Sequence, residues 1–306
     1  MITVLCGGVG AARMLHALRG VTEPASITGV VNTGDDLDLH GLRICPDLDT
    51  ISYTLAGLNN EVTGWGLEGE TWRVMDELEQ LGGEAWFRLG DRDLATHLYR
   101  TQRLAEGATL SEVTAELGAR LGIDVTLLPM SEDPVSTTFE SVEHGRISFQ
   151  DYFVRYRHDV TITEITFEGA RAASPSPGVL EALEEAERIV ISPSNPLISI
   201  APIMAVPGIR KILGRRRSDV IAVSPLIGGK ALKGPADRLL VELGHEPSPQ
   251  GIARLYRDVI GSLVIDEVDG ATAGLVRSEG VSCLVTNTNM GEPDAASHLA
   301  KVVLDG

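Results

Sequence analysis

The chain has 306 residues, of which 43% are hydrophobic and 23% charged, and its formal net charge at pH 7 is −17. So acidic a chain is unsuited to binding long nucleic acid, because proteins hold its phosphates with a surplus of Lys and Arg side chains. No apolar run approaches the ~20 residues of a membrane span, and the N-terminus has no basic segment or cleavage pattern of a signal peptide. We therefore expect a cytoplasmic globular protein with no membrane or nucleic-acid partner.

The three cysteines, Cys6, Cys45 and Cys283, are odd in number and have no paired spacing. This pattern indicates buried thiols instead of a disulfide framework or a zinc site. The length allows one large α/β domain or two smaller units, and we favour one core with an insertion.

A glycine-rich turn follows the first apolar run, Ile2 to Cys6. It reads Gly7-Gly8-Val9-Gly10 and leads through Arg13 into a predicted helix. Strand, glycine turn and helix aim backbone N–H groups at a phosphate. The spacing is not that of a dinucleotide fingerprint and the Walker lysine is absent. The turn therefore predicts either a ligand site or a close packing contact.

Four carboxylates follow the second apolar run, Ile27 to Val31. Asp35 and Asp36 come directly after Asn32-Thr33-Gly34, and the segment that contains Asp47 and Asp49 begins within a dozen residues of them. Carboxylates that converge repel one another unless a hard cation such as Mg²⁺ neutralises them. The alternatives are a solvated turn for the first pair and a cap on a helix from Leu48 to Leu58 for the second. His40 and Arg43, between the two pairs, are either substrate contacts or surface residues.

The region from Asn59 to Gly122 has helical periodicity and no strand-like run. The predicted helices are Glu70 to Leu81, Asp91 to Leu104 and Ser111 to Leu121. The second helix opens on a dense group, Asp91, Arg92, Asp93 and His97, which is either functional or a capped, ion-paired surface turn.

Four strand-like segments come next: Val125 to Leu128, Ser136 to Val142, Ile147 to Phe149 and Val160 to Phe167. The last alternates apolar and polar residues, which indicates an antiparallel or edge strand with one wet face. Aromatic and arginine residues from Tyr152 to Arg157 suit stacking on a planar ring, or plain packing.

The second half returns to alternating strands and helices. Strands are predicted at Arg188 to Ser192, Asp219 to Val223, Leu263 to Ile265 and Val281 to Val285, with helices at Pro177 to Ala186, Pro235 to Leu243, Pro249 to Arg257 and Asp294 to Val303. Polar or glycine-rich loops follow four strands, and Lys230 and Lys233 in one of them are either diphosphate ligands or surface residues. Because open α/β sheets bind ligands at the carboxyl ends of their strands, we expect a nucleotide-like site there.

The predicted fold is α/β, with a Rossmann-like, mostly parallel sheet flanked by helices and a largely helical insertion. Residues 1–58 and 170–306 form the nucleotide-binding core in this prediction. Residues 59–169 form the insertion, helical and then short strands, which covers the acceptor site.

With these loops in order, the sequence resembles the 2-phospho-L-lactate transferase family, which acts in biosynthesis of the deazaflavin coenzyme factor 420, and particularly its actinobacterial phosphoenolpyruvate branch. The matching segments are Gly7–Gly10 with Arg13, Asn32–Asp36, His40–Thr50, Gly90–His97, Ser192–Pro196 and Ser224–Lys230.

The resemblance implies transfer of a 2-phospholactyl or enolpyruvyl phosphate group from a guanosine diphosphate-linked donor to the terminal ribityl hydroxyl of the deazaflavin precursor, with release of GMP. It also implies Mg²⁺ and a homodimer. Phosphoglycerate differs from the other two acids by so little that the sequence does not choose among them. The alternative is a non-catalytic nucleotide-sugar or metabolite-binding regulatory protein on the same scaffold, which would not need the paired acids.

Site residues follow from the resemblance residue by residue. Asp35 and Asp49 are the expected Mg²⁺ ligands, with Asp47 and Asp36 as supporting or alternative ligands. Asp35, Asp36 and Asp49 are the expected catalytic group, and Asp36 is the favoured but unranked proton acceptor. The donor residues are Gly8, Gly10, Arg13, Asn32, Asn195, Gly228, Gly229 and Lys230. The expected contacts to the deazaflavin are His40, Arg92 and His97.

Overall fold

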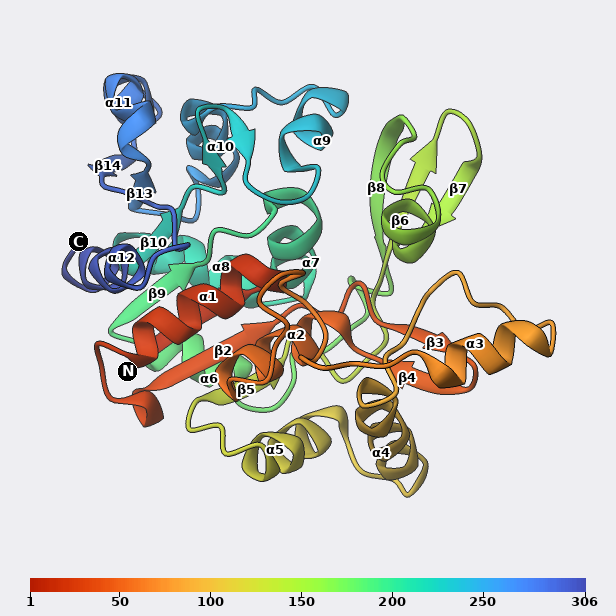
Figure 1. Ribbon diagram of the computed structural model, residues 1–306. Coiled ribbons are helices and arrows are strands. Elements are labelled where there is room, and N and C mark those ends of the chain that lie inside the picture. The colour runs from red at the N-terminus through yellow and green to blue at the C-terminus, as the bar shows by residue number, and fades with distance from the viewer.

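Seven parallel strands form the centre of the structure, a computed structural model that describes residues 1–306 (Figure 1). Their order is β14 (Ser282–Val285), β13 (Ser262–Ile265), β10 (Val220–Val223), β9 (Arg188–Ile191), β1 (Ile2–Cys6), β2 (Ile27–Val31) and β5 (Thr126–Pro129). The predicted α/β fold with a mostly parallel sheet is confirmed. Strand order reverses at β1, whose Ile2 lies opposite Ile27 on one side and Arg188 on the other.

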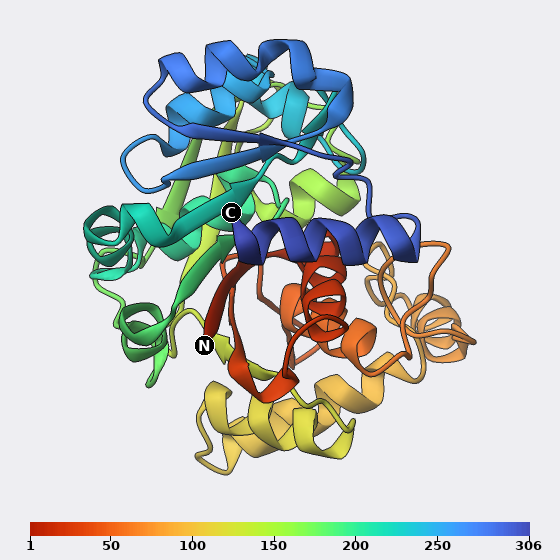
Figure 2. The same ribbon diagram turned by 90° about the vertical axis from the view of Figure 1, so that its left-hand side faces the viewer.

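Helices cover both faces of this sheet because successive strand residues point to opposite sides. Val4 and Val190 face one core cluster, whereas Leu5 and Ile189 face the other. The first face carries α1 (Gly8–Arg19), α2 (Pro46–Leu55) and α12 (Pro293–Asp305). The second carries α6 (Val179–Glu185), α7 (Ala201–Ala205), α8 (Ile209–Arg215), α10 (Pro249–Tyr256) and α11 (Ala273–Ser278). Figure 2 shows α12 lying against α1, which brings the last helix of the chain to the first.

Residues 59–169 divide into two lobes beside the sheet (Figure 1). The helical lobe contains α3 (Arg73–Gln80), α4 (Asp93–Ala105) and α5 (Leu110–Arg120). The sheet lobe is antiparallel, in the order β7 (Gly145–Ser148), β6 (Ser136–Ser141) and β8 (Ile162–Glu168), and includes the helical turn Asp151–Arg155. Between the lobes the chain forms β5, which pairs with β2, so this range also contributes an edge strand to the central sheet.

The remaining elements are short. They are the hairpins β3 (Leu37–Leu39) with β4 (Leu42–Ile44) and β11 (Leu226–Ile227) with β12 (Lys230–Ala231), the helix α9 (Ala236–Glu242), and the turns Pro24–Ser26, Pro196–Ile200, Arg217–Asp219 and Glu267–Thr272. The three cysteines are buried and unpaired, as predicted. No single helix is long and apolar enough to cross a membrane. The one pair that passes by length and composition, Pro196–Ala205 with Ile209–Arg215, is bent by 97°.

Candidate active site

A cavity of about 540 Å³ opens where the carboxyl ends of the strands meet the two lobes. Its lining includes Gly8 and Gly10 after β1, Asp35 after β2, Asn195 after β9 and Ser224 after β10. The strand-end loops singled out in the sequence therefore do surround one space, as expected for an open α/β sheet.

The glycine turn is shorter than the sequence suggests, because α1 already begins at Gly8. Gly8 has a φ of 64°, which favours glycine. A Cβ on Gly10 would lie 2.3 Å from the Pro193 carbonyl oxygen, and one on Gly7 would lie 2.5 Å from Ser199 Cβ. Close packing against the loop after β9 thus accounts for Gly7 and Gly10. The start of α1 and Arg13 nevertheless line the cavity.

Asp35 and Asp47 form a pair that faces the cavity and shares one amide. The Asn32 side-chain nitrogen donates to Asp35 Oδ1 at 3.3 Å and to Asp47 Oδ2 at 3.0 Å, while Asn32 Oδ1 accepts from the Gly34 N–H. Both carboxylates are buried. Burial, and then repulsion from Asp47, raises the pKa of Asp35 well above its usual value. Burial raises the pKa of Asp47 to about 6, although Asn32 and the Gly8 N–H act to lower it. Such a pair, rich in oxygen and short of positive charge, fits a hard divalent cation.

The other two predicted acids lie close by but have different partners. Asp36 lies outside the cavity lining beside the Cys45 thiol, and burial raises its pKa to about 8. Asp49 lines the cavity, but both of its oxygens are paired with the guanidinium of Arg100, one of them at 3.1 Å. The other three carboxylates all raise the pKa of Asp35, so the predicted convergence is present. Of the three that line the cavity, Asp49 has a cationic partner, whereas Asp35 and Asp47 have none.

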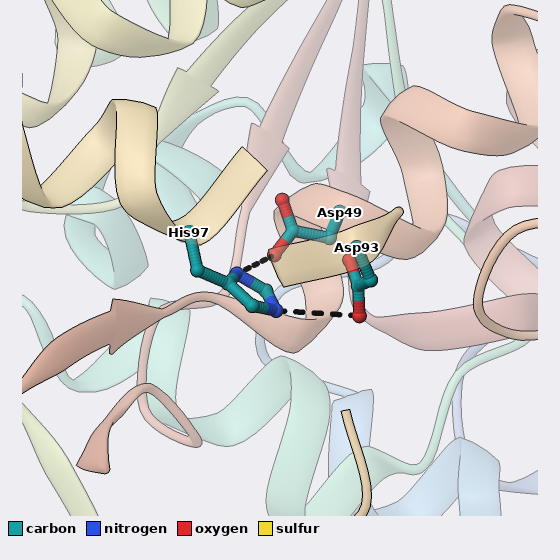
Figure 3. Close-up of side chains that lie close together, drawn as sticks. All are labelled: Asp49, Asp93 and His97. Carbon is teal, nitrogen blue, oxygen red and sulfur yellow. Dashed lines mark ion pairs between the residues drawn. The ribbon is translucent and has the colours of Figure 1, made fainter. Parts of the chain in front are cut away.

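Asp49, Asp93 and His97 meet at a second point on the cavity wall, with His97 between the two carboxylates (Figure 3). His97 Nδ1 is 3.7 Å from Asp49 Oδ2 and Nε2 is 3.2 Å from Asp93 Oδ2. One ligand atom from each residue lies within 4.8 Å of the others, a spacing that suits a metal ion. Arg100, however, already neutralises Asp49 here.

Residues 90–93 take part mainly in capping the N-termini of two helices, α3 and α4. The Glu70 carboxylate accepts from the N–H groups of Arg92 and Asp93 at the start of α4. The Asp91 carboxylate accepts from the N–H of Val74 in α3. A Cβ on Gly90 would overlap the Glu70 carboxylate, so a larger residue there would displace this cap. The alternative of a capped turn is thus observed for Asp91, whereas Asp93 and His97 reach the cavity.

Several residues expected at the site lie outside the cavity lining. Arg92 is exposed, and His40 is exposed in the turn between β3 and β4 with a φ of 54°. Asn32 lies behind the two carboxylates that it bridges. The residues Gly228, Gly229 and Lys230 are also absent from the lining, and the Gly228 N–H donates to Asp269. Their predicted ligand roles gain no support from the cavity.

Lys233, the second lysine of that loop, does line the cavity. Its ammonium donates to the Thr63 carbonyl at 3.1 Å. Burial, and then the nearby charge of Arg13, lowers the pKa of Lys233. Neither cation is within ion-pair distance of an acid, so together they form a small basic site in a strongly acidic chain.

Aromatic side chains line another part of the cavity. Phe149 and Phe153 are stacked, with ring centroids 5.0 Å apart and planes 5° apart. Trp86, from the helical lobe, lies under the guanidinium of Arg155 at 4.5 Å and so links the two lobes. Both lobes therefore offer flat apolar surface to a ligand.

Two buried residues around this wall, Tyr53 and Arg100, were not identified from the sequence. The half-buried Asp93 was named only within a group that is either functional or a capped turn. The Tyr53 hydroxyl donates to Asp93 Oδ1 at 2.6 Å. The sequence held one signal for the other two, because Asp93, His97 and Arg100 are spaced four and three apart and so share one face of a helix.

A family model described as "2-phospho-L-lactate transferase CofD" matches residues 2–293. The chain is 43% identical to a phosphoenolpyruvate transferase of Streptomyces griseus over 99% of this chain and 97% of the relative. It is 38% identical to a 2-phospho-L-lactate transferase of Methanosarcina mazei, over 98% of each chain. A crystal structure of a UPF0052 family protein from Bacillus halodurans superposes with a TM-score of 0.66 at 15% identity, covering 99% of this chain and 98% of the other. That likeness bears on the fold alone.

Proposed function

The chain belongs to the 2-phospho-L-lactate transferase CofD family, and from this premise we propose that it is a transferase of coenzyme factor 420 biosynthesis. The proposed reaction moves a 2-phospholactyl or enolpyruvyl phosphate group from a guanosine diphosphate-linked donor to the ribityl terminal hydroxyl of the deazaflavin precursor and releases GMP. One observation supports it above the others: a single cavity joins a carboxylate pair, two unpaired cations and aromatic walls.

Each part of that cavity suits one part of the proposed reaction. Arg13 and Lys233 bind the donor diphosphate, whose charge they complement. The stacked Phe149 and Phe153 hold the planar deazaflavin. Asn32 orients Asp35 and Asp47, which line the same cavity.

Asp35 and Asp47 are the residues that we propose hold Mg²⁺. Their oxygen atoms are the ligand type that Mg²⁺ prefers, and their raised pKa values reflect burial and mutual repulsion that a cation would relieve. We assign no metal contact to Asp49, since Arg100 pairs with both of its oxygens. When bound, the ion would neutralise charge on the transferred phosphoryl group.

The reaction itself can be tested by product mass. The protein is incubated with Mg²⁺, the deazaflavin precursor and, in separate reactions, guanylated phospholactate, phosphoenolpyruvate or phosphoglycerate. We expect a phosphodiester product from one of the first two. If none of the three donors yields product, the proposed activity is wrong.

Asp35→Asn tests the metal site. We expect turnover to fall by at least about a hundredfold, as for loss of a main electrostatic group in catalysis, with an unchanged circular dichroism spectrum. Asp38→Asn is the matched control, because Asp38 is exposed, pairs with Arg43 and lies outside the cavity. Near-normal turnover of Asp35→Asn would contradict the metal role.

A further inference from the structure

Asp93 is an acidic side chain on the cavity wall that the proposed reaction leaves without a role. It is the first residue of α4, and its backbone N–H is held by Glu70. The Tyr53 hydroxyl donates to its Oδ1 at 2.6 Å, and His97 Nε2 lies 3.2 Å from its Oδ2. Two buried side chains therefore contact the carboxylate of Asp93, whose side chain is 18% exposed and lines the cavity.

Arg100 determines which nitrogen of His97 carries the proton. A guanidinium has only donors, and Arg100 Nη1 lies 3.3 Å from His97 Nδ1 and 3.1 Å from Asp49 Oδ2. When Nδ1 accepts this contact, the proton of a neutral imidazole is on Nε2, which faces Asp93. The His97 side chain is 1% exposed, and Nε2 has no well-formed hydrogen bond, so its 3.2 Å approach to Asp93 Oδ2 is its nearest polar contact with an acid.

These contacts keep Asp93 anionic. Burial alone would raise the pKa of Asp93, but the contacts from His97 and Tyr53, together with the charge of Arg100, outweigh burial and lower it. Each carboxylate oxygen has more acceptor capacity than Tyr53 and His97 use. The wall thus presents a fixed negative acceptor to the cavity.

The charge of this acceptor selects the kind of ligand group that it meets. A phosphate would be repelled by Asp93 and attracted to Arg13 and Lys233, which line the same cavity without acidic partners. An N–H or O–H group on a neutral ligand would be bound. Both proposed substrates have such groups, the donor in its guanosine part and the precursor in its ring and ribityl chain. Asp93 belongs to the helical lobe, in the insertion predicted to cover the acceptor site, so we assign its contact to the precursor.

We infer that Asp93 accepts a hydrogen bond from an N–H or O–H group of the deazaflavin precursor, and that Tyr53, His97 and Arg100 position its carboxylate for this contact. The inference rests on the proposed function for the identity of that ligand. It assigns Asp93 to recognition of the acceptor substrate, separate from the metal pair and the diphosphate site.

Asp93→Ala tests the contact directly. Binding of the precursor to wild type and variant is measured by fluorescence titration without donor, and the Michaelis constants of both substrates are measured in full reactions. We expect the Kd and KM for the precursor to rise about tenfold to a hundredfold, the range for a hydrogen bond to a charged group. The KM for the guanylated donor should change less than twofold.

Two further variants separate recognition from folding. Tyr53→Phe removes one O–H that orients Asp93, and we expect a smaller rise in the Kd for the precursor. Asp91→Ala removes the nearby cap on α3, and we expect a lower Tm with an unchanged Kd. An unchanged Kd in a folded Asp93→Ala, or an equal rise in the KM for the donor, overturns the inference.

Failure of the proposed function gives a different pattern. A wild-type protein that binds the precursor in an Asp93-dependent way but forms no product supports the inference and refutes the transferase activity. A wild-type protein that turns over, with normal precursor binding in Asp93→Ala, refutes the inference alone. Absence of precursor binding in the wild type overturns both.

Discussion

The ion pair between Arg100 and Asp49 joins the helical lobe to the core, and its loss should lower the free energy of unfolding. Arg100 in α4 is 2% exposed and Asp49 in α2 is 8% exposed. Burial alone would lower the pKa of Arg100, but the charge of Asp49 outweighs burial and raises it, so the guanidinium stays charged. Replacing Arg100 by Leu would leave the Asp49 carboxylate buried without a cation.

Removing one partner of a buried pair costs about 3–5 kcal/mol in free energy of unfolding. In a chain of this size each kcal/mol lowers Tm by roughly 2 °C. For Arg100→Leu we therefore expect Tm to fall by roughly 6–10 °C, measured by circular dichroism at pH 7 and fixed protein concentration.

Arg103→Leu is the matched control on the same helix. Arg103 pairs with Glu116, and both side chains are about a third exposed, so we expect a far smaller change in Tm. The double variant Asp49→Leu with Arg100→Leu should recover much of the loss, because no unpaired charge remains. A fall in Tm no larger for Arg100→Leu than for Arg103→Leu would refute the reasoning.

Two other predictions concern single side chains. Lys233→Met should raise the KM for the guanylated donor about tenfold or more, as for a lost charge-assisted contact. Lys230→Met should leave this KM within twofold, because of the two lysines only Lys233 lines the cavity. Equal effects of the two variants in steady-state kinetics would contradict the assignment. Hydrogen bonds from Arg103 lower the pKa of Glu116 to about 2. The ionised carboxylate therefore stabilises the fold at pH values above its ordinary pKa of about 4.3, and this stabilisation is lost as the pH falls toward about 2. Glu116→Gln should therefore lower Tm at pH 7, and the gap to wild type should close between about pH 4 and pH 2; a constant gap across that range would be inconsistent with this linkage.

The sequence predicted the central strands well because they are apolar runs that end in glycine or polar residues. It missed the hairpin of β3 and β4, whose strands have three residues each. The turn between them is His40-Gly41, with φ values of 54° and 75°. Two consecutive positive φ values are typical of a tight hairpin turn. His40 lies in this turn and outside the cavity lining, so its contact with substrate stays a prediction.

The acidic site was predictable in content but not in its division of roles. Spacing along the chain places Asp35, Asp36, Asp47 and Asp49 near one strand end. It carries no information about Arg100, which approaches Asp49 from an inserted helix. That contact depends on how the helical lobe docks on α2, which is a property of tertiary packing. The same limit applied to Lys230 and Lys233, which differ only in the direction that the loop after β10 gives them.

The position of β1 in the sheet also determines when the chain can complete its fold during synthesis. Its neighbours are β2, which begins at Ile27, and β9, whose pairing with Ile2 begins only at Arg188. Until that segment leaves the ribosome, one edge of an apolar parallel pair stays open, and contacts so distant in sequence form slowly. Nascent chains that end before Arg188 should therefore associate through β1 and depend on chaperones.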